Sequence, residues 1–503
     1  MGDYRQLKMY TSLKRTLPEM GALPENMALH TADEHSRAAW NWIIRASFGD
    51  NKWDYKTTIE DDPTCAPERT FFVSCHSADI ATTAARIMED GTGRVHMVGT
   101  HPTWTGLSAA RYTVLAAMKS LQDAGVTDCY LSTDDFRKPA IKIYRELGFA
   151  PYYEADDQEM IDRWAAIERD MAAYRKKERK PILLWPDGGA PDTAACGSQA
   201  QPSLMPYPVA GSRGAVIVCP GGGYHIKAYH EGAPIARAIN MCGVSAFVLD
   251  YRVQPFTSVD TPIGDGLRAV RLLRSLGYEK VAILGFSAGG HLSGMVATRF
   301  DAGDPGAKDP VERFSSRPDA FVPCYGATSY YRFRAHPHDI IGAGDWKKAA
   351  DYSAECRVTG DTPPAFIWHT ADDHVVPVES AYDLARALAA HGVPCEMHIY
   401  PHGPHGLGQA TGYPDIQQWP DLLGKWLISL GFGAEEGERA ARRAGGFEAG
   451  TVSGIIRELR CLKFRGQAPR FHEKNRSISS FLFELQNDNI HMKKLKGVNR
   501  LWI

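Results

Sequence analysis

The segment from Val281 to Thr298 constrains the fold of this chain more than any other. It begins with Val281-Ala-Ile-Leu284, an apolar run typical of a short buried strand. Gly285-Phe-Ser-Ala-Gly-Gly290 follows at once, and the residues after it have a helical pattern. A glycine-flanked serine between a strand and a helix requires a tight turn, which leaves room only for small residues two positions on either side. The segment therefore predicts an α/β sheet with Ser287 raised above its edge.

Hydrophobic patterning and local composition divide the 503 residues into four regions. Residues 213–432 alternate apolar strand-like runs with amphipathic helices, which predicts a mainly parallel sheet with crossover helices. Residues 1–172 alternate in a similar way and are expected to form an α/β domain of their own. Residues 173–212, first charged and then rich in Pro, Gly, Ala and Ser, indicate a linker or N-terminal arm. Residues 433–503 are expected to be a basic, poorly ordered tail with a short helix at 452–462, or alternatively an interaction arm.

Composition narrows the class of protein. Hydrophobic residues make up 44% and charged residues 23%, with a net charge of −2, the balance of a soluble globular protein. The charge argues against nucleic-acid or membrane-surface partners, which need a basic excess. The ten cysteines lie far apart without a CxxC pair, so we expect reduced thiols. With no apolar leader and no long apolar run, the expected location is the cytoplasm.

A glycine-rich turn precedes the serine segment in the sequence. Ala215-Val-Ile-Val-Cys219 has the pattern of a buried strand and ends in Pro220-Gly-Gly-Gly-Tyr224. Glycines let a backbone N–H turn towards a substrate, so Gly222, Gly223 and Ala288 are the candidate oxyanion donors. The alternatives are a plain loop or a phosphate cradle. A P-loop would end in Gly-Lys-Ser/Thr, whereas Tyr224-His225 stand here.

A candidate carboxylate follows the strand predicted at 364–369. Two aspartates compete there, Asp372 and Asp373, and Asp373 is preferred because it fits the spacing Asp-x-x-Val-Pro. Such a carboxylate would hold a histidine in the required tautomer. The alternative interpretation is that both aspartates cap the helix predicted at 378–389.

A candidate base lies in the Gly/Pro loop after the strand predicted at 395–400. His405, between Gly403 and Gly406, is preferred over His402. His398, His402 and His405 are close in sequence, but His398 lies inside the strand and no carboxylate set is near, so no metal site is predicted. Ser287, Asp373 and His405 then follow one another in the order of a serine hydrolase triad.

Residues 213–432 resemble the esterase/lipase-type α/β-hydrolases that include acetyl xylan esterases and related carbohydrate esterases. The resemblance is carried by the following stretches: CPGGGY at 219–224, His230-Glu231-Gly232, Leu249-Asp250-Tyr251-Arg252, GFSAGGH at 285–291, HTADDHVVP at 369–377 and YPHGPHG at 400–406. It implies a serine carboxylic ester hydrolase that needs no cofactor and removes small acyl groups, often acetyl, from a small-molecule or oligosaccharide ester. A serine peptidase is the alternative. Tyr224, His225 and Tyr251 are candidates to line the acyl or sugar pocket.

The first region has its own anion-site pattern. A strand at 94–100 leads through a turn of small residues into a helix that ends at Ala124. A strand at 128–133, a helix at 138–147 and Gly148-Phe149 follow. A strand, a small-residue turn and a helix N-terminus form a site suited to a pyrophosphate.

Residues 1 to about 165 resemble the GNAT-type N-acetyltransferases, through the loop after His101-Pro102 and the ending Tyr144-Arg-Glu-Leu-Gly148-Phe149. The resemblance implies binding of acetyl-coenzyme A, with Tyr144 as the general acid for the leaving thiolate. It assigns the following coenzyme-binding residues: Val98, Thr100, Thr105, Gly106, Ser108, Ala109 and Ala110. The family's loop arginine is absent, and Glu60, Asp61, Asp134 and Asp135 are unsupported candidates for the base.

Three functions remain open for the whole chain. The first is an esterase with an attached acetyltransferase-like domain. The second is a bifunctional enzyme that also transfers acetyl groups from acetyl-coenzyme A. In the third, the first region is only a binding or scaffolding module.

Overall fold

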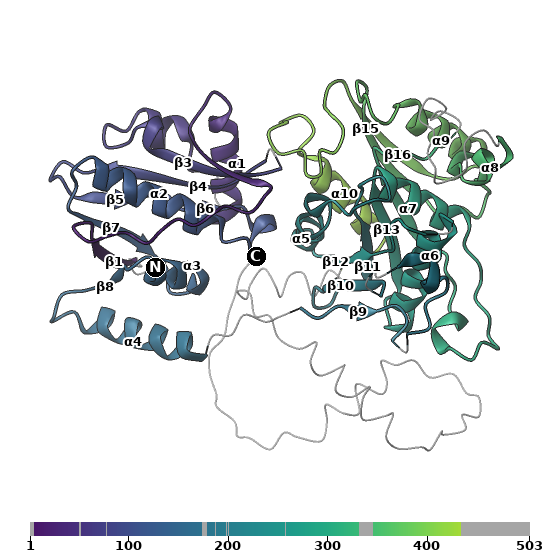
Figure 1. Cartoon of the computed structure of the whole chain (residues 1–503), viewed down its shortest axis with the longest axis horizontal. Coiled ribbons are helices and arrows are strands. Elements are labelled where there is room, and N and C mark those ends of the chain that lie inside the picture. The colour runs from purple at the N-terminus through teal and green to yellow at the C-terminus, as the bar shows by residue number, and fades with distance from the viewer. Residues whose placement is uncertain are drawn as a thin grey trace, which may run out of the picture. The chain divides into compact units, whose positions relative to one another are not determined.

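The computed structural model describes residues 5–433, apart from 50–51, 77, 174–178, 187, 198, 200, 257 and 331–345. The chain divides into two compact units, Met1–Phe447 and Glu448–Ile503. The predicted tail, with its helix at 452–462, lies outside the described residues except for Gly433. The described part of the first unit contains two eight-stranded sheets (Figure 1).

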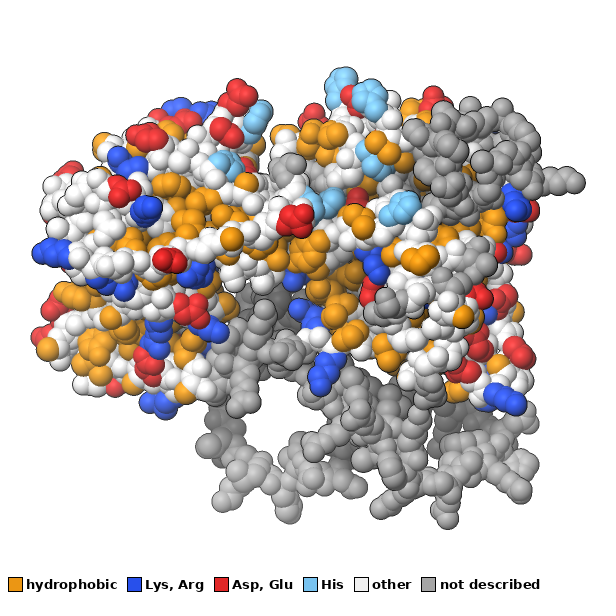
Figure 2. All heavy atoms as spheres, in the orientation of Figure 1, with side chains coloured by type: hydrophobic (Ala, Val, Ile, Leu, Met, Phe, Trp, Pro, Cys, Tyr) orange, Lys and Arg blue, Asp and Glu red, His pale blue; other side chains and the backbone are white. Residues whose placement is uncertain are grey.

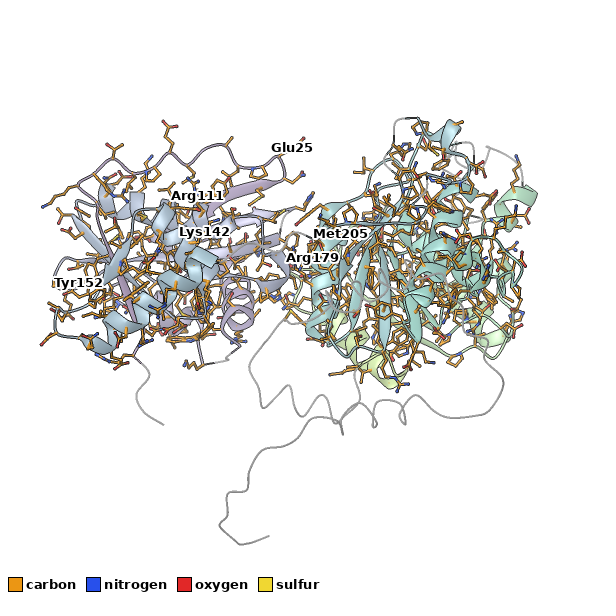
Figure 3. All side chains as sticks on the ribbon, turned by 90° about the horizontal axis from the view of Figure 1, so that it is seen from below. Glu25, Arg111, Lys142, Tyr152, Arg179 and Met205 are labelled. Carbon is orange, nitrogen blue, oxygen red and sulfur yellow. The ribbon has the colours of Figure 1, made fainter. Side chains whose placement is uncertain are left out.

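The first sheet is built from the first third of the chain. Its strands are β1 (Leu7–Ser12), β2 (Met27–Thr31), β3 (Thr70–Cys75), β4 (Ala78–Ile87), β5 (Gly93–Val95), β6 (Gly99–Thr100), β7 (Asp128–Thr133) and β8 (Ala150–Tyr152). The order is β2-β3-β4-β5-β7-β1-β8, with β6 paired to β4. The first strand in sequence thus lies between β7 and β8, antiparallel to both. Tyr152, labelled in Figure 3, marks the β8 edge.

Helices cover this sheet because their apolar positions recur at helical spacing. They are α1 (Ser36–Phe48), α2 (Ala109–Asp123), α3 (Lys138–Glu146) and α4 (Gln158–Ala173). Residues of α2, α3 and α4 share one core cluster with Leu7 and Met9 of β1. Residues of α1 pack in another cluster with Phe72 of β3 and Ala84 of β4.

The strand predicted at 94–100 is divided into β5 and β6. β5 pairs with β7 in parallel through Gly93 and Arg94, and β6 then turns to pair with β4. Gly99 is buried there against α1, where a Cβ would come within 2.7 Å of Ile44. After β5, the chain therefore no longer pairs with β7 and pairs with β4 instead, just before the loop that leads into α2.

The second sheet confirms the predicted α/β fold with a mainly parallel sheet. Its strands are β9 (Ile182–Leu183), β10 (Ser203–Tyr207), β11 (Gly214–Cys219), β12 (Ser245–Asp250), β13 (Lys280–Phe286), β14 (Ala320–Cys324), β15 (Ala365–Thr370) and β16 (Cys395–Tyr400). The order is β16-β15-β14-β13-β11-β12-β10-β9. Pairs from β16 to β12 are parallel, and β10 adds antiparallel to β12 and to β9. The segment predicted as a linker, 173–212, thus supplies β9 and β10.

Helices lie on both faces of the second sheet (Figure 1). They are α5 (Ala233–Met241), α6 (Asp260–Ser275), α7 (Ala288–Thr298), α8 (Trp346–Asp351), α9 (Glu379–Ala390) and α10 (Trp419–Ser429). Residues of α6, α7 and α9 form one buried cluster with the sheet, and those of α5 and α10 form another. The central strands β11, β14 and β15 are buried along their whole length, which explains their near-continuous apolar runs. Among the described residues, no helix is both long and apolar enough to cross a membrane.

Candidate active site

Ser287 lies at the turn between β13 and α7. Its backbone has φ +51° and ψ −114°, a conformation that a non-glycine residue adopts only when its surroundings impose it. A Cβ on Gly285 would lie 1.8 Å from the carbonyl oxygen of Gly289. A Cβ on Gly289 would lie 2.1 Å from the carbonyl oxygen of Cys219 in β11. The close packing of α7 against β11 and β13 thus explains the glycines and holds the hydroxyl above the end of the sheet.

Ser287, His405 and Asp373 come from the loops after β13, β16 and β15 and form one hydrogen-bonded chain. His405 Nε2 lies 2.8 Å from Ser287 Oγ, and Nδ1 lies 2.7 Å from Asp373 Oδ2. A carboxylate can only accept, so Nδ1 carries the proton and Nε2 of the neutral ring accepts the serine hydroxyl. Figure 2 shows histidine side chains (pale blue) gathered where the loops after β15 and β16 lie. This geometry equips Ser287 as a nucleophile with a base in contact.

Asp373 is held as a carboxylate. Burial opposes its ionisation, but the hydrogen bond from His405 and those from the N–H groups of Val375 and Val376 outweigh it, so its pKa lies below the ordinary value. His369 lies 4.0 Å from the same carboxylate, and burial lowers its pKa to about 4. His369 is therefore neutral near pH 7. The charged group in contact with His405 is Asp373.

The two residues that competed for these positions pair with each other instead. Asp372 Oδ2 lies 3.1 Å from His402 Nδ1, and Asp372 Oδ1 accepts the N–H of Gly403 at 2.8 Å. The His402 side chain is 85% exposed. Thr370 donates to the carbonyl of Gly403 at 2.8 Å. Both the N–H and the carbonyl of Gly403 are therefore bonded to side chains at the end of β15, which holds the loop that carries His405.

The three histidines in β16 and the loop after it have separate partners. His398 of β16 pairs with Glu396, His402 with Asp372 and His405 with Asp373. Within the part of the chain that the structure describes, no group of His, Cys, Asp or Glu side chains has the arrangement of a metal site.

The predicted oxyanion donors lie in two segments beside Ser287. Gly222 has φ +125°, and a Cβ there would come within 2.4 Å of the carbonyl oxygen of Ile226, so the turn requires glycine. Ala288 is the first residue of α7. Among the described residues, the N–H groups of Gly222, Gly223 and Ala288 donate to no other protein group. They are available to a substrate oxygen.

Two of the three predicted pocket residues are buried supports. The Tyr224 hydroxyl lies 2.7 Å from His291 Nδ1, and Tyr251 donates to the carbonyl of Pro220 at 2.5 Å. His291 Nε2 lies 2.9 Å from the Tyr352 carbonyl, so Nε2 donates and Nδ1 accepts from Tyr224. Burial lowers the pKa of His291 to about 4, which keeps the ring neutral. The large rings of Tyr224 and Tyr251 therefore pack against and support the glycine-rich loop. His225, by contrast, is exposed.

In the first region, the predicted coenzyme residues lie between the end of β5 and the first turn of α2. Thr105, Gly106 and Ser108 are exposed in the loop before α2. Gly106 has φ +94° and Ser108 has φ +59°, so the loop turns its backbone sharply into the helix. Of the remaining predicted residues, Val98 and Ala110 are half-buried, Thr100 belongs to β6 and Ala109 is buried at the start of α2.

Tyr144 lies in α3 and is 5% exposed, with its ring 6.2 Å from that of Phe149. Burial raises the pKa of its hydroxyl. The four acidic candidates for a base lie in ion pairs: Glu60 with Arg37, Asp61 with Lys56, Asp134 with Arg137 and Asp135 with Arg163. No carboxylate among these four is poised to take a proton from an acceptor amine.

Sequence reasoning gave no role to two residues that join the loops of this site. Glu231 accepts from the N–H of Gly221 at 2.7 Å, and Tyr325 donates to Glu231 at 2.6 Å. Glu231 stood within a recognised motif without an assigned function. Tyr325 follows β14, and no neighbouring residue in the sequence marks it.

Two family models match the chain. Residues 260–421 match that of the prolyl oligopeptidase family, and residues 37–149 match that of the acetyltransferase (GNAT) family. These regions correspond to parts of the second and the first sheet with their helices.

The relatives divide in the same way. Endo-1,4-beta-xylanase B of Butyrivibrio fibrisolvens is 36% identical over 212 residues, 40% of this chain and 33% of the relative. The acetylxylan esterase of Xylanibacter ruminicola is 31% identical over 242 residues, 45% of this chain and 48% of the relative. The mycothiol acetyltransferase of Thermomonospora curvata is 27% identical over 143 residues, 27% of this chain and 48% of the relative. The chain thus spans a third to about half of the length of these relatives.

Among solved structures, an acetyl ester-xyloside bifunctional hydrolase from Caldicellulosiruptor lactoaceticus is 41% identical, with a TM-score of 0.48. The alignment covers 51% of this chain and 98% of that one.

Proposed function

Because the chain joins a GNAT region to an α/β-hydrolase region with acetylxylan esterase relatives, we propose that it is a serine carboxylic ester hydrolase that removes acetyl groups from a carbohydrate. The observation that carries the proposal is the hydrogen-bonded chain from Ser287 through His405 to Asp373. The unused N–H groups of Gly222, Gly223 and Ala288 support it, because ester hydrolysis needs donors for an oxyanion.

The first half of the reaction forms an acyl-enzyme. His405 Nε2 takes the proton of Ser287 while Oγ attacks the ester carbonyl carbon. The carbonyl oxygen becomes an oxyanion and is stabilised by the N–H groups of Ala288 and of Gly222 or Gly223, with each donor contributing about 3 kcal/mol. Asp373 stabilises the imidazolium that forms. The tetrahedral intermediate then collapses, the bond to the alcohol oxygen breaks, and that oxygen leaves with the proton from His405.

The second half returns the free enzyme. His405 takes a proton from water as the water oxygen attacks the acyl carbon. The second tetrahedral intermediate uses the same N–H donors. Its collapse breaks the bond to Ser287 Oγ, which recovers the proton from His405 and releases the carboxylic acid.

Ester hydrolysis tests this proposal directly. We expect wild-type protein to hydrolyse 4-nitrophenyl acetate faster than the butyrate and octanoate esters, and to release acetate from acetylated xylo-oligosaccharides. Ser287→Ala should abolish turnover. Ser429→Ala, at an exposed serine of α10, is the matched control and should retain it. Absence of turnover of every short ester by folded wild-type protein would refute the esterase.

A serine peptidase is the second candidate, and the match of residues 260–421 to the prolyl oligopeptidase family favours it. The same triad cleaves amides, so the distinction lies in the substrate. Prolyl peptide 4-nitroanilides, assayed beside the acetate ester, separate the two. Cleavage of the anilides without ester release from acetylated sugars would favour the peptidase.

We also propose that the first region binds acetyl-coenzyme A. The change of strand partner from β7 to β4 after β5, and the loop before α2 with Thr105, Gly106 and Ser108 exposed, fit a pyrophosphate held by backbone N–H groups. Thr105 stands where the related family has an arginine, so the backbone would carry the binding. The coenzyme, when bound, supplies the acetyl group, and Tyr144 would hand a proton to its leaving sulfur.

A thermal-shift titration with acetyl-coenzyme A tests that binding. Binding to the folded state raises the unfolding temperature by mass action. Gly106→Val, at a φ of +94° that disfavours a side chain, should remove the shift. If wild-type protein shows no shift, the first region is a scaffolding module, as the third hypothesis for the chain has it.

The proposed location is the cytoplasm. The nine described cysteines are free thiols, and Cys356 among them is exposed, as suits a reducing compartment. Cell fractionation of the natural host tests it, and recovery of the protein in the medium would refute it.

A further inference from the structure

A buried carboxylate lies directly behind the glycine-rich loop. Glu231 is 2% exposed. Among the described residues, no Lys or Arg forms an ion pair with it, and His230 Nε2 lies 3.8 Å from Oε1. That nitrogen donates to the carbonyl of Gly406 at 2.8 Å. A buried charge without a cation is costly, so this position calls for a reason beyond stability.

One oxygen of Glu231 holds the loop that carries two of the oxyanion donors. Glu231 Oε2 accepts the N–H of Gly221 at 2.7 Å. A Cβ on Gly221 would lie 2.7 Å from that oxygen and 3.1 Å from the Cβ of Ser287. The Gly221 backbone is therefore packed between the carboxylate and the nucleophile. Any movement of Glu231 therefore shifts the loop that carries the proposed oxyanion donors Gly222 and Gly223.

The other oxygen of Glu231 reaches the loop that carries the base. Oε1 accepts the hydroxyl of Tyr325 at 2.6 Å, and the same hydroxyl accepts the N–H of Gly408 at 2.8 Å. The Tyr325 ring lies edge-on to that of His405, with centroids 5.1 Å apart. Tyr325 follows β14 with φ +34°, and its N–H donates to Trp368 of β15 at 2.8 Å. One side chain thus connects the carboxylate with the His405 loop.

We propose that Glu231 is a positioning residue for the esterase reaction: through Gly221 it places the oxyanion donors, and through Tyr325 it places His405 and stabilises the imidazolium with its charge. The inference rests on the proposed function. Charge acts over several ångströms in this setting because the interior screens it weakly.

Four further titratable side chains lie around Glu231 and His405, and one of them is His230, whose Nε2 lies 3.8 Å from Glu231 Oε1. Asp373 is ionised, and His369 is neutral above about pH 4, as its lowered pKa requires. Tyr325 is neutral because burial raises its pKa well above the ordinary value. Glu231→Gln therefore removes one unit of charge and leaves these three groups in place.

Glu231→Gln is the central variant, because it keeps shape and one acceptor while it removes the charge. We expect kcat for 4-nitrophenyl acetate to fall roughly 10- to 100-fold, less than the loss of an oxyanion donor, with KM nearly unchanged. We expect the acid limb of the kcat/KM profile to move to lower pH, because the imidazolium is less stabilised. Glu231→Asp keeps the charge but not the reach, so kcat should fall while the acid limb stays in place.

Tyr325→Phe removes the link to Gly408 and leaves the ring against His405. We expect a lower kcat, and we expect the Glu231→Gln/Tyr325→Phe double variant to lose less than the product of the two single losses, because both act through one connection. Glu279→Gln, in a surface pair with Arg213, is the matched control and should retain wild-type rates.

A second readout keeps this inference separate from the choice of substrate. The rate at which a fluorophosphonate labels Ser287 depends on the same base and oxyanion donors and needs no natural substrate. Slower labelling of folded Glu231→Gln, with a shifted pH profile, supports the role even if wild-type protein hydrolyses no ester. Labelling within about twofold of wild type on an unshifted profile would overturn it, as would a loss explained entirely by a smaller labelled fraction.

Discussion

At the scale of single residues, the two adjacent aspartates after β15 have different partners. Asp373 holds the ring that activates Ser287, and Asp372 holds the loop backbone at Gly403. The sequence placed both within one motif, and only the spacing favoured Asp373. Substitution of each in turn separates the chemical role from the anchoring role.

We expect Asp373→Asn to reduce kcat about 10,000-fold, because an amide that donates to Nδ1 forces the wrong tautomer on His405. Asp372→Asn should cost less than about 10-fold, the worth of an ordinary hydrogen bond. Steady-state kinetics on 4-nitrophenyl acetate compares them. Equal losses would show that the loop anchor, rather than the tautomer, limits the reaction.

His30 in the first sheet predicts a pH dependence of stability. The hydrogen bond to Asp79, at 2.8 Å, outweighs partial burial and raises the pKa of His30 to about 9. A raised pKa contributes stability that is fully present below the unfolded value near 6.5 and is lost as pH rises through about 9. We expect the urea midpoint of wild-type protein to fall between pH 6.5 and 9 more than that of His30→Gln. Parallel profiles would contradict the assigned pair.

At the scale of elements, the start of α7 is tightly packed against β11 and β13. Gly289→Ala places a methyl group against the carbonyl of Cys219, so the helix must move away from β11. We expect a loss of about 1–3 kcal/mol in stability together with loss of ester hydrolysis. Urea unfolding and kinetics measure the two effects.

Gly264 of α6 is the matched control. A Cβ there meets nothing within 4 Å, and Ala is the better helix former. Gly264→Ala should therefore stabilise the protein by about 0.5–1 kcal/mol with unchanged kinetics. Destabilisation of similar size in both variants would refute a specific contact at Gly289.

The elements around the triad were predictable because each apolar run ends in a turn rich in Gly, Pro or Asp, as at β11, β13, β15 and β16. The split of the strand at 94–100 was not, because its cause is the packing of Gly99 against α1, a contact distant in sequence. β9 and β10 were hidden in a segment of linker composition and form by pairing with a distant edge, β12. The role of Tyr325 was not predicted for the same reason, since its partners, Glu231 and Gly408, are 94 and 83 residues away in the sequence.

At the scale of the whole molecule, each sheet has core clusters of its own. We therefore expect the two proposed activities to be separable. Ser287→Ala should leave the thermal shift with acetyl-coenzyme A intact, and Tyr144→Phe should leave ester hydrolysis intact. A change in kcat for 4-nitrophenyl acetate on addition of acetyl-coenzyme A would contradict this independence.

The place of β1 in the first sheet has a consequence for the order in which the chain is made. Leu7 pairs with Thr133, and Met9 pairs with Pro151, so β1 leaves the ribosome more than a hundred residues before its partners exist. Until then, Leu7 and Met9 have no core in which to be buried, so we expect a chaperone to bind this exposed apolar segment. A nascent chain stalled before residue 128 should be protease-sensitive in β1. A nascent chain extended well past residue 152 should protect the same segment. The time at which the first sheet is completed is therefore set by the synthesis of β7 and β8 and not by the local folding of β1.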